Sequence, residues 1–210
     1  MVIRIRIPSE DQWSEMFRAD ARGFGWVPEP GDSEARRPLV DLSRFRIAVE
    51  RDQIVGIAGS YAIEATMPGG TTVPMSGITW VSVSATHRRR GVLTDLIGAC
   101  HADTDERGEP VAMLFASEGG IYERFGYGIG SSMRNVTIDR RRASLRPELG
   151  PARGAVRFVD GDEALAHVTA VWERARRLRA GEVSRSGAWH RFVLDLWAKV
   201  LPNWRRNANA

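Results

Sequence analysis

The segment 88–91, Arg-Arg-Arg-Gly, carries the clearest chemical signal in this chain. Before it, residues 79–84 alternate between apolar and polar side chains as a β-strand does, and after it apolar residues follow at helical spacing from Val92 to Ile97. Such a turn binds anions, because the first N–H groups of a helix have no partner within the helix and its dipole adds about half a positive charge there. The expected anion is a pyrophosphate, so the turn predicts a nucleotide-bearing cofactor.

The elements around this turn exclude two common phosphate-binding folds. A doubly wound nucleotide fold begins with its phosphate loop, whereas residues 88–91 follow a long run of strands. A P-loop requires a lysine followed by serine or threonine, which this turn lacks.

Alternating apolar residues and turn signals predict an α+β domain over residues 1–142. A helix capped by Ser9 and a helix over 92–107 accompany the strands, and a hairpin at 67–70 joins two of them. A short helix is expected from 117 to 125, and a right-handed crossover joins the strands on either side of 92–107. Strands are expected at 2–7, 44–50, 54–66, 72–84, 110–116 and 130–139.

Beyond residue 142 the pattern restarts after a stretch rich in proline, glycine and arginine. We interpret residues 143–154 as a linker. A strand at 155–160 and the helices after it resemble the opening of the first domain, so residues 155–210 are expected to begin a second, related domain that the chain leaves incomplete.

Composition narrows the class of protein. The 210 residues are 43% hydrophobic and 27% charged, which is ordinary for a globular protein. No apolar run reaches the roughly 18 residues of a membrane span, no secretory signal is expected, and a single cysteine, Cys100, favours a cytoplasmic location. The net charge is +4, but the arginines are interleaved with acids, so we expect no nucleic-acid partner. No His/Cys/Asp cluster has metal-ligand spacing, so no metal is expected.

Two segments, WVSVSATHRRRGVLTDLI at 80–97 and FASEGGIYERFGYG at 115–128, resemble the GCN5-related N-acetyltransferase (GNAT) superfamily. Within it they are most similar to the N-terminal half of the enhanced intracellular survival (Eis) acetyltransferases. The usual turn, Arg/Gln-x-x-Gly-x-Gly/Ala, has Leu93 here in place of its last small residue, which is the form seen in the Eis group. The resemblance implies the acyl-CoA N-acyltransferase fold, a mixed and mostly antiparallel central sheet flanked by helices.

The resemblance also implies acetyl-CoA as a substrate and assigns residues to it. Backbone groups of Val81, Ser82 and Val83 would bind the pantetheine amides as an added strand does. Ser117 and Glu118 would line the far side of the cofactor. The pyrophosphate would be held by Arg89, Arg90, Gly91, Val92, Leu93 and Thr94.

Tyr122 matches the general acid of the Eis group, which protonates the departing thiolate of coenzyme A. The alternative is a core aromatic residue whose hydroxyl meets a backbone group. Tyr127 is a rival proton donor. His87 is expected to contact phosphate or solvent, and His101 is expected to have no partner.

The acceptor pocket is less well marked. The loop 23–32 carries Phe24 and Trp26, whose rings would wall a substrate pocket or else cap the core. In Eis proteins, which are about twice as long, the terminal carboxylate acts as general base. Glu64 and Glu118 are possible substitutes here, and Glu64 is the third residue that we assign to the pocket.

The resemblance therefore predicts an acetyl-CoA-dependent N-acetyltransferase that acts on an amine of an aminoglycoside, a polyamine or a lysine side chain. One alternative is a protein that binds acetyl-CoA but is catalytically impaired because it lacks the second half. Another is a basic interaction module without enzymatic activity. The apolar face of an incomplete second domain favours a homo-oligomer.

Overall fold

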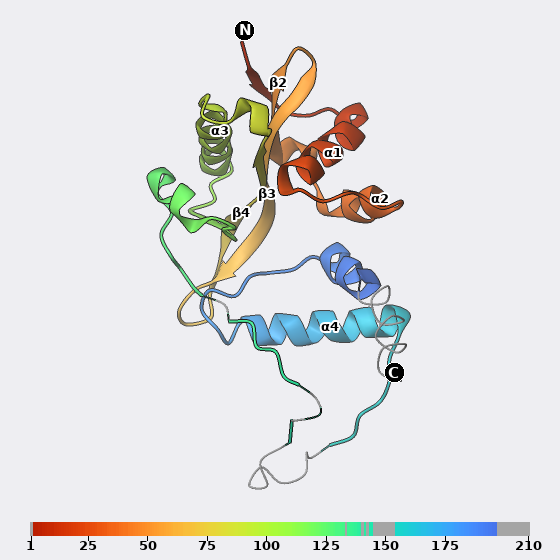
Figure 1. Cartoon of the computed structure of the whole chain (residues 1–210). Helices are drawn as coiled ribbons and strands as arrows, with labels where there is room; N and C mark the ends of the chain where they lie inside the picture. Colours follow the sequence, from red (N-terminus) through yellow and green to blue (C-terminus); the bar gives the residue numbers. More distant parts are fainter. Residues whose placement is uncertain (1, 133, 140, 142, 145–153, 197–210) are drawn as a thin grey trace.

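The computed structural model describes residues 2–132, 134–139, 141, 143–144 and 154–196 (Figure 1). One sheet contains five strands in the order in which they occur along the chain. The first four are antiparallel neighbours, and the last pair is parallel. This confirms the mixed, mostly antiparallel sheet. The strands are β1 (Arg4–Arg6), β2 (Phe45–Glu50), β3 (Gln53–Thr66), β4 (Thr72–Val83) and β5 (Val111–Leu114).

Helices cover both faces of the sheet, α1 (Trp13–Phe24) and α2 (Asp32–Arg36) on one side and α3 (Val92–Glu106) on the other (Figure 1). The α1 face buries a cluster that includes Met16, Phe45 and Ile57. The α3 face buries a second cluster built around Leu96 and Ile97. The expected helix at 92–107 is confirmed. The expected helix at 117–125 forms instead as two 3₁₀ turns, Gly119–Ile121 and Glu123–Phe125.

Strand β4 changes its neighbours halfway along its length. It pairs with β5 only from Met75 to Ile78, and β3 continues beside it as far as Val83. A β-bulge interrupts the β3–β4 ladder, and within it Trp80 has a φ of 53°. Past Ile78, no strand in the described part of the chain covers the second edge of β4. The sheet therefore forks between β4 and β5.

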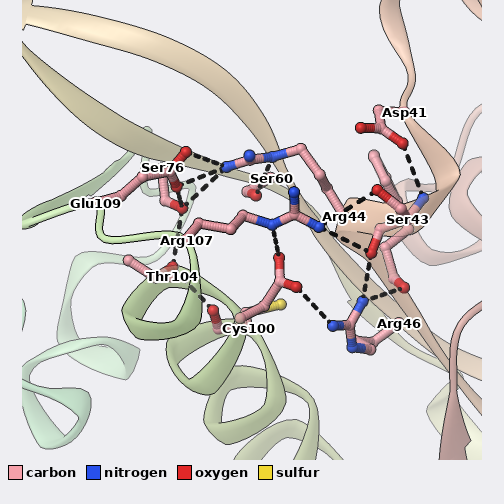
Figure 2. A network of polar contacts seen from close by, with 12 residues as sticks. Asp41, Ser43, Arg44, Arg46, Ser60, Ser76, Cys100, Thr104, Arg107 and Glu109 are labelled. Carbon is pink, nitrogen blue, oxygen red and sulfur yellow. Dashed lines mark hydrogen bonds and ion pairs between the residues drawn. The ribbon is translucent and has the colours of Figure 1, made fainter.

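A buried polar network closes the other end of this fork (Figure 2). Arg44 forms an ion pair with Glu109 at 2.6 Å, and both side chains are less than a tenth exposed. A neighbouring pair joins Arg46 to Asp103 at 2.8 Å. The network thereby ties β2, β3 and β4 to the C-terminal end of α3 and to the start of β5. The other labelled members are Asp41, Ser43, Ser60, Ser76, Cys100, Thr104 and Arg107.

Two expected strands are wrong. Residues 130–132, 134–139 and 155–160 are described without strand structure. Their apolar side chains are largely exposed, Val136 at 77% and Phe158 at 99%. Alternation alone does not make a strand, because the backbone also needs an edge to pair with.

The C-terminal part contains α4 (Gly161–Arg176) and a helix over 187–196. Residues 181–184 run along the end of β3, where the Thr66 N–H donates to the Glu182 carbonyl at 2.8 Å and the Gly181 N–H donates to the Thr66 carbonyl at 2.8 Å. Most of the expected linker, 145–153, and the end of the expected second domain, 197–210, lie outside the described residues. No helix among those described is long and apolar enough to cross a membrane.

Candidate functional site

The turn 88–91 has the geometry of an anion site. Gly91 is the N-cap of α3 with a φ of 83°, and Arg89 has a φ of 60°. The first hydrogen bond of the helix runs from the Asp95 N–H to the Gly91 carbonyl at 3.1 Å. The three N–H groups before it, at 92–94, have no partner in the described structure. Together with the helix dipole they favour an anionic ligand.

The arginine side chains of the turn are not all free. Arg90 donates to Oε1 of Glu50 at 2.7 Å, and His87 Nε2 lies 3.1 Å from Oε2 of the same carboxylate. His87 also lies 2.8 Å from the Thr86 hydroxyl. The sequence did not predict the contact of His87 with Glu50, and its expected contact with phosphate or solvent stays a prediction. Hydrogen bonds from Arg90 and His87 hold the pKa of Glu50 below its usual range. Arg88 and Arg89 remain exposed.

The uncovered edge of β4 adjoins the turn. Val81 and Val83 turn their side chains toward the α3 cluster, which also receives Leu93. Ser82 faces α1 closely enough that a Cβ at Gly23 would lie 2.4 Å from its own Cβ. The backbone of 81–83 thus runs between α1 and α3 beside the turn 88–91, and its assignment to pantetheine stays a prediction.

Tyr122 packs against the same α3 cluster as Val81 and Leu93. It lies between the two 3₁₀ turns, and its hydroxyl has no hydrogen bond to a described residue. Burial raises the pKa of Tyr122, and the charge of Glu118 adds to the effect. The phenol therefore stays protonated at neutral pH and is available as a proton donor. Ser117 and Glu118 are exposed after β5.

Tyr127, the rival proton donor, already has a hydrogen-bond partner. The Tyr127 hydroxyl lies 3.1 Å from Nε2 of His101, so the expectation that His101 lacks a partner is wrong. Burial raises the pKa of Tyr127 to about 12. Burial also raises the pKa of the Cys100 thiol to about 12, as expected of a buried apolar residue.

The three residues assigned to an acceptor pocket do not come together. Trp26 packs edge-on against Phe17, with ring centroids 5.4 Å apart, and joins an aromatic cluster on the α1 face. Phe24 is 51% exposed. Glu64 forms an ion pair with Arg176 at 2.9 Å, near the far end of β3. Of the three, only Trp26 lies in the aromatic cluster on the α1 face, where it contacts Phe17 and Arg36.

Sequence reasoning missed a carboxylate in that cluster. Asp20 is 7% exposed, and its Oδ1 atom has no hydrogen-bond partner among the described residues. Burial raises the pKa of Asp20 to about 7, with the nearby Arg36 charge opposing the shift. The available signal was its spacing, because Asp20 follows Met16 by four residues and Phe17 by three and so shares their buried face. In the described residues, no group of three or more His, Cys, Asp or Glu could hold a metal ion.

Comparisons with known proteins agree with this geometry. The profile of the acetyltransferase (GNAT) domain matches residues 4–130. An uncharacterized N-acetyltransferase of Streptomyces avermitilis is 38% identical over 197 residues, which are 93% of this chain and 48% of that protein. The N-acetyltransferase Eis of Mycobacterium tuberculosis is 36% identical over 220 aligned positions, covering 100% of this chain and 54% of Eis. The chain thus spans about half the length of the curated relatives it matches.

Solved structures show the same similarity. The crystal structure of Eis1 from Mycobacterium abscessus superimposes with a TM-score of 0.72 at 35% identity, over 93% of this chain and 48% of that one. A predicted acetyltransferase from Clostridium acetobutylicum, solved with acetyl-CoA, has a TM-score of 0.55 at 19% identity and covers 65% of this chain and 96% of its own. At that identity the second likeness shows the fold alone.

Proposed function

Because the chain belongs to the GNAT family of acetyltransferases and is of the Eis type, we propose that it transfers the acetyl group of acetyl-CoA to an amine. Residues 1–142 form the acetyltransferase domain, 143–154 the linker and 155–210 the start of a second GNAT-like domain. The amine belongs to an aminoglycoside, a polyamine or a lysine side chain.

The observation that carries the proposal is a set of backbone N–H groups at the start of α3, unpaired within the described residues, next to the uncovered edge of β4. The N–H groups at 92–94 have no partner in the described part of the chain, and they follow directly on Gly91 and the exposed Arg89. The pyrophosphate of coenzyme A fits such a site by charge and by hydrogen bonding. The backbone of 81–83 supplies the groups that pair with pantetheine amides, in the manner of an added strand.

Catalysis follows from holding both substrates in this fork. The amine nitrogen attacks the thioester carbon, the carbon–nitrogen bond forms, and the carbon–sulfur bond breaks with its electron pair on sulfur. Tyr122 donates a proton to that sulfur. Proximity accounts for at most about 7–11 kcal/mol of the barrier, and a positioned proton donor adds roughly 10²–10⁴-fold.

A two-stage experiment tests the proposal. In the first stage, the midpoint of thermal unfolding is measured with and without acetyl-CoA. A ligand at a hundred times its dissociation constant stabilises by about 2.7 kcal/mol, so a clear upward shift is expected. No shift at saturating acetyl-CoA would contradict the cofactor site and favour a basic interaction module.

In the second stage, thiol release is measured with kanamycin, spermidine and Nα-acetyl-lysine as acceptors. Turnover with at least one amine is expected. Binding without thiol release from any of them would favour the alternative of a protein that binds acetyl-CoA without productive catalysis.

Two further expectations remain proposals. The single cysteine is the ground for a cytoplasmic location. Exposed apolar side chains on and after α4, including Val171 at 54% and Leu178 at 84%, are the ground for a homo-oligomer. Size-exclusion chromatography with light scattering tests the second, and a monomer across the concentration range would contradict it.

A further inference from the structure

Asp20 lies at the centre of the face that α1 turns toward the sheet. Met16 and Phe17 on that face are almost fully buried, and Asp20 is 7% exposed. Its Oδ1 atom has no hydrogen-bond partner among the described residues. Burying a carboxylate without a partner is unfavourable, and packing gives no reason for an acid at this position. The group fits a ligand that brings a positive charge.

Aromatic rings gather on the same face of the sheet as this carboxylate. The ring of Phe17 lies 5.4 Å from that of Trp26 and 6.1 Å from that of Trp80, measured between centroids. Trp80 donates a hydrogen bond from Nε1 to the Tyr61 hydroxyl at 3.1 Å. Tyr61 packs against the α1-face cluster and Asp20 lies on the buried face of α1, so both are on the same side of the sheet. Burial raises the pKa of Tyr61, and the charge of Asp20 adds a smaller effect in the same direction.

This cluster already accommodates one cation. The Arg36 guanidinium lies 5.8 Å from the Phe17 ring centroid and 5.2 Å from that of Trp26. Its ion pair is with Asp32 at 3.6 Å, so its charge reaches Asp20 only through space. The ring faces are therefore suited to cations, and the carboxylate beside them remains available to a second one.

The position of α1 connects this cluster to the fork. Gly23 follows Asp20 by three residues, about 4.5 Å along the helix, and packs directly on Ser82. Ser82 belongs to the β4 edge to which we assign the pantetheine. Tyr122 packs on the opposite side of that edge, with the α3 cluster. A thioester held at the edge would have a proton donor on one side and Asp20 on the other.

We propose that Asp20 binds the ammonium group of a primary alkylamine acceptor beside the rings of Phe17, Trp26 and Trp80 and takes up the proton that this group must lose. The inference rests on the proposed function, since it assigns the acceptor side of the same site. It replaces Glu64 and Glu118 as the base, because Glu64 is ion-paired with Arg176 and Glu118 is exposed.

The protons balance as follows. The ammonium group loses two protons on becoming an amide. The first passes to the Asp20 carboxylate and from there to solvent, which leaves the nitrogen lone pair free to attack. The second leaves nitrogen as the intermediate collapses, and it restores the Tyr122 phenol, which has given its own proton to sulfur. The net products are the amide, the thiol of coenzyme A and one proton.

The acid–base behaviour of Asp20 suits this task. Burial raises its pKa to about 7, so the carboxyl group exchanges protons readily near neutral pH. A base is most effective when its pKa lies near the working pH. Among the described residues, the charged group near it is Arg36 from α2, and the neutral phenol of Tyr61 from β3 is the other titratable group near it.

The test compares the wild-type chain with Asp20→Asn, Asp20→Glu and the matched control Asp11→Asn, which removes an exposed acid just before α1. Tryptophan fluorescence is titrated with 1,4-diaminobutane, with and without acetyl-CoA. We expect Asp20→Asn to bind the diamine at least about 30-fold more weakly, because removing one partner of a buried charged contact is costly. We expect Asp20→Glu to recover part of the loss and Asp11→Asn to match the wild type.

Kinetics supply the readout that a structural role would not change. For turnover of 1,4-diaminobutane, kcat/KM of the wild type should fall below an inflection near pH 7, and Asp20→Asn should lose both the inflection and about 100-fold in rate. Its dissociation constant for acetyl-CoA should stay within about twofold of the wild type, which also shows that the variant is folded.

Two results would overturn the inference. One is an Asp20→Asn variant with unchanged diamine affinity and pH profile. The other is a wild-type chain with no saturable diamine binding under either condition. A wild-type chain that does not bind acetyl-CoA would instead contradict the proposed function. In that case the diamine titration without acetyl-CoA would still decide whether Asp20 binds the amine.

Discussion

Arg90 donates a hydrogen bond to the carboxylate of Glu50 across 2.7 Å, at the turn where the free N–H groups of α3 begin. His87 binds the other oxygen of that carboxylate. A pyrophosphate bound at the proposed site would therefore have to compete with this carboxylate for Arg90.

Replacing Glu50 with glutamine should strengthen the binding of coenzyme A. The substitution removes a negative charge beside the anion site and frees Arg90, and because the pair is partly exposed the expected effect is modest. We expect affinity to rise about two- to fivefold at low salt, and less at high salt because the charges are screened. Isothermal titration calorimetry checks this. Asp52→Asn removes an exposed acid from the adjacent turn and should have little effect. Weaker binding by Glu50→Gln would mean that Glu50 is needed to position Arg90.

The glycine that caps α3 and a glycine within α3 should respond in opposite directions to replacement by alanine. Gly91 has a φ of 83° with open space around it, so an alanine there suffers from backbone strain alone, about 1–2 kcal/mol. The strain also reorients the N–H groups and should weaken acetyl-CoA binding. Gly98 lies within the helix with equally open space, and its replacement should stabilise the protein by about 0.5–1 kcal/mol. Urea unfolding measures both. Equal stability of the two variants would contradict the strained turn.

Replacing Tyr122 and Tyr127 with phenylalanine should have different effects, one on turnover and the other on stability. Tyr122→Phe should lower kcat by roughly 10²–10⁴-fold and leave the KM for acetyl-CoA nearly unchanged, because only the proton donor is lost. Tyr127→Phe should cost about 1 kcal/mol of stability by removing the hydrogen bond to His101, with kcat retained. Unchanged turnover in Tyr122→Phe would exclude it as the general acid.

The buried pair of Arg44 and Glu109 should dominate the stability of the closed end of the fork. Glu109→Gln leaves a buried guanidinium without its counter-ion, so we expect a loss of about 3–5 kcal/mol in the free energy of unfolding. Glu10→Gln removes the exposed partner of Arg37 and should cost less than about 1 kcal/mol. Chemical denaturation compares the two, and similar losses would mean that the buried pair is not a major source of stability.

Asp20 should make the protein less stable as pH rises. Its pKa in the folded protein is raised from 3.8 to about 7, so the folded state binds more protons than the unfolded state between those values. Stability from this group is complete below about pH 4 and declines up to about pH 7, at about 1.4 kcal/mol per pH unit or less. Asp20→Asn should flatten that decline in urea titrations from pH 4 to pH 8. A parallel decline in the variant would assign it to other groups.

The sequence predicted those features that are written locally. The strand, the turn 88–91 and the helix that follows are adjacent in the chain, so hydrophobic period and turn residues were enough to predict these elements. The contact of Glu50 with His87 joins residues 37 apart, and no local pattern reports it. Helical spacing places Asp20 on the buried face of α1 with Met16 and Phe17. It was missed because the buried face was identified from its apolar residues alone.

The two wrong strands have a different cause. Residues 130–139 and 155–160 alternate as strands do, but alternation describes only which side chains could share a face. A ladder also requires a neighbouring edge, and that is a property of the whole fold. The C-terminal half of β4 illustrates the same requirement: it continues as a strand past the end of β5 because β3 still pairs with its other edge.

The order of the strands has a consequence for the order of events during synthesis. Each strand of the sheet pairs with its successor in the chain, so the fork and the anion turn need nothing beyond β5 to take shape. The segment that closes on the end of β3 comes much later, since Ser184 binds Glu64 across 120 residues. Domains tend to fold from the N-terminus as the ribosome releases them. A nascent chain would thus form the fork and the turn 88–91 while the helix that brings Trp189 to Tyr61 is still being made, and the ring of Tyr61 would be covered last.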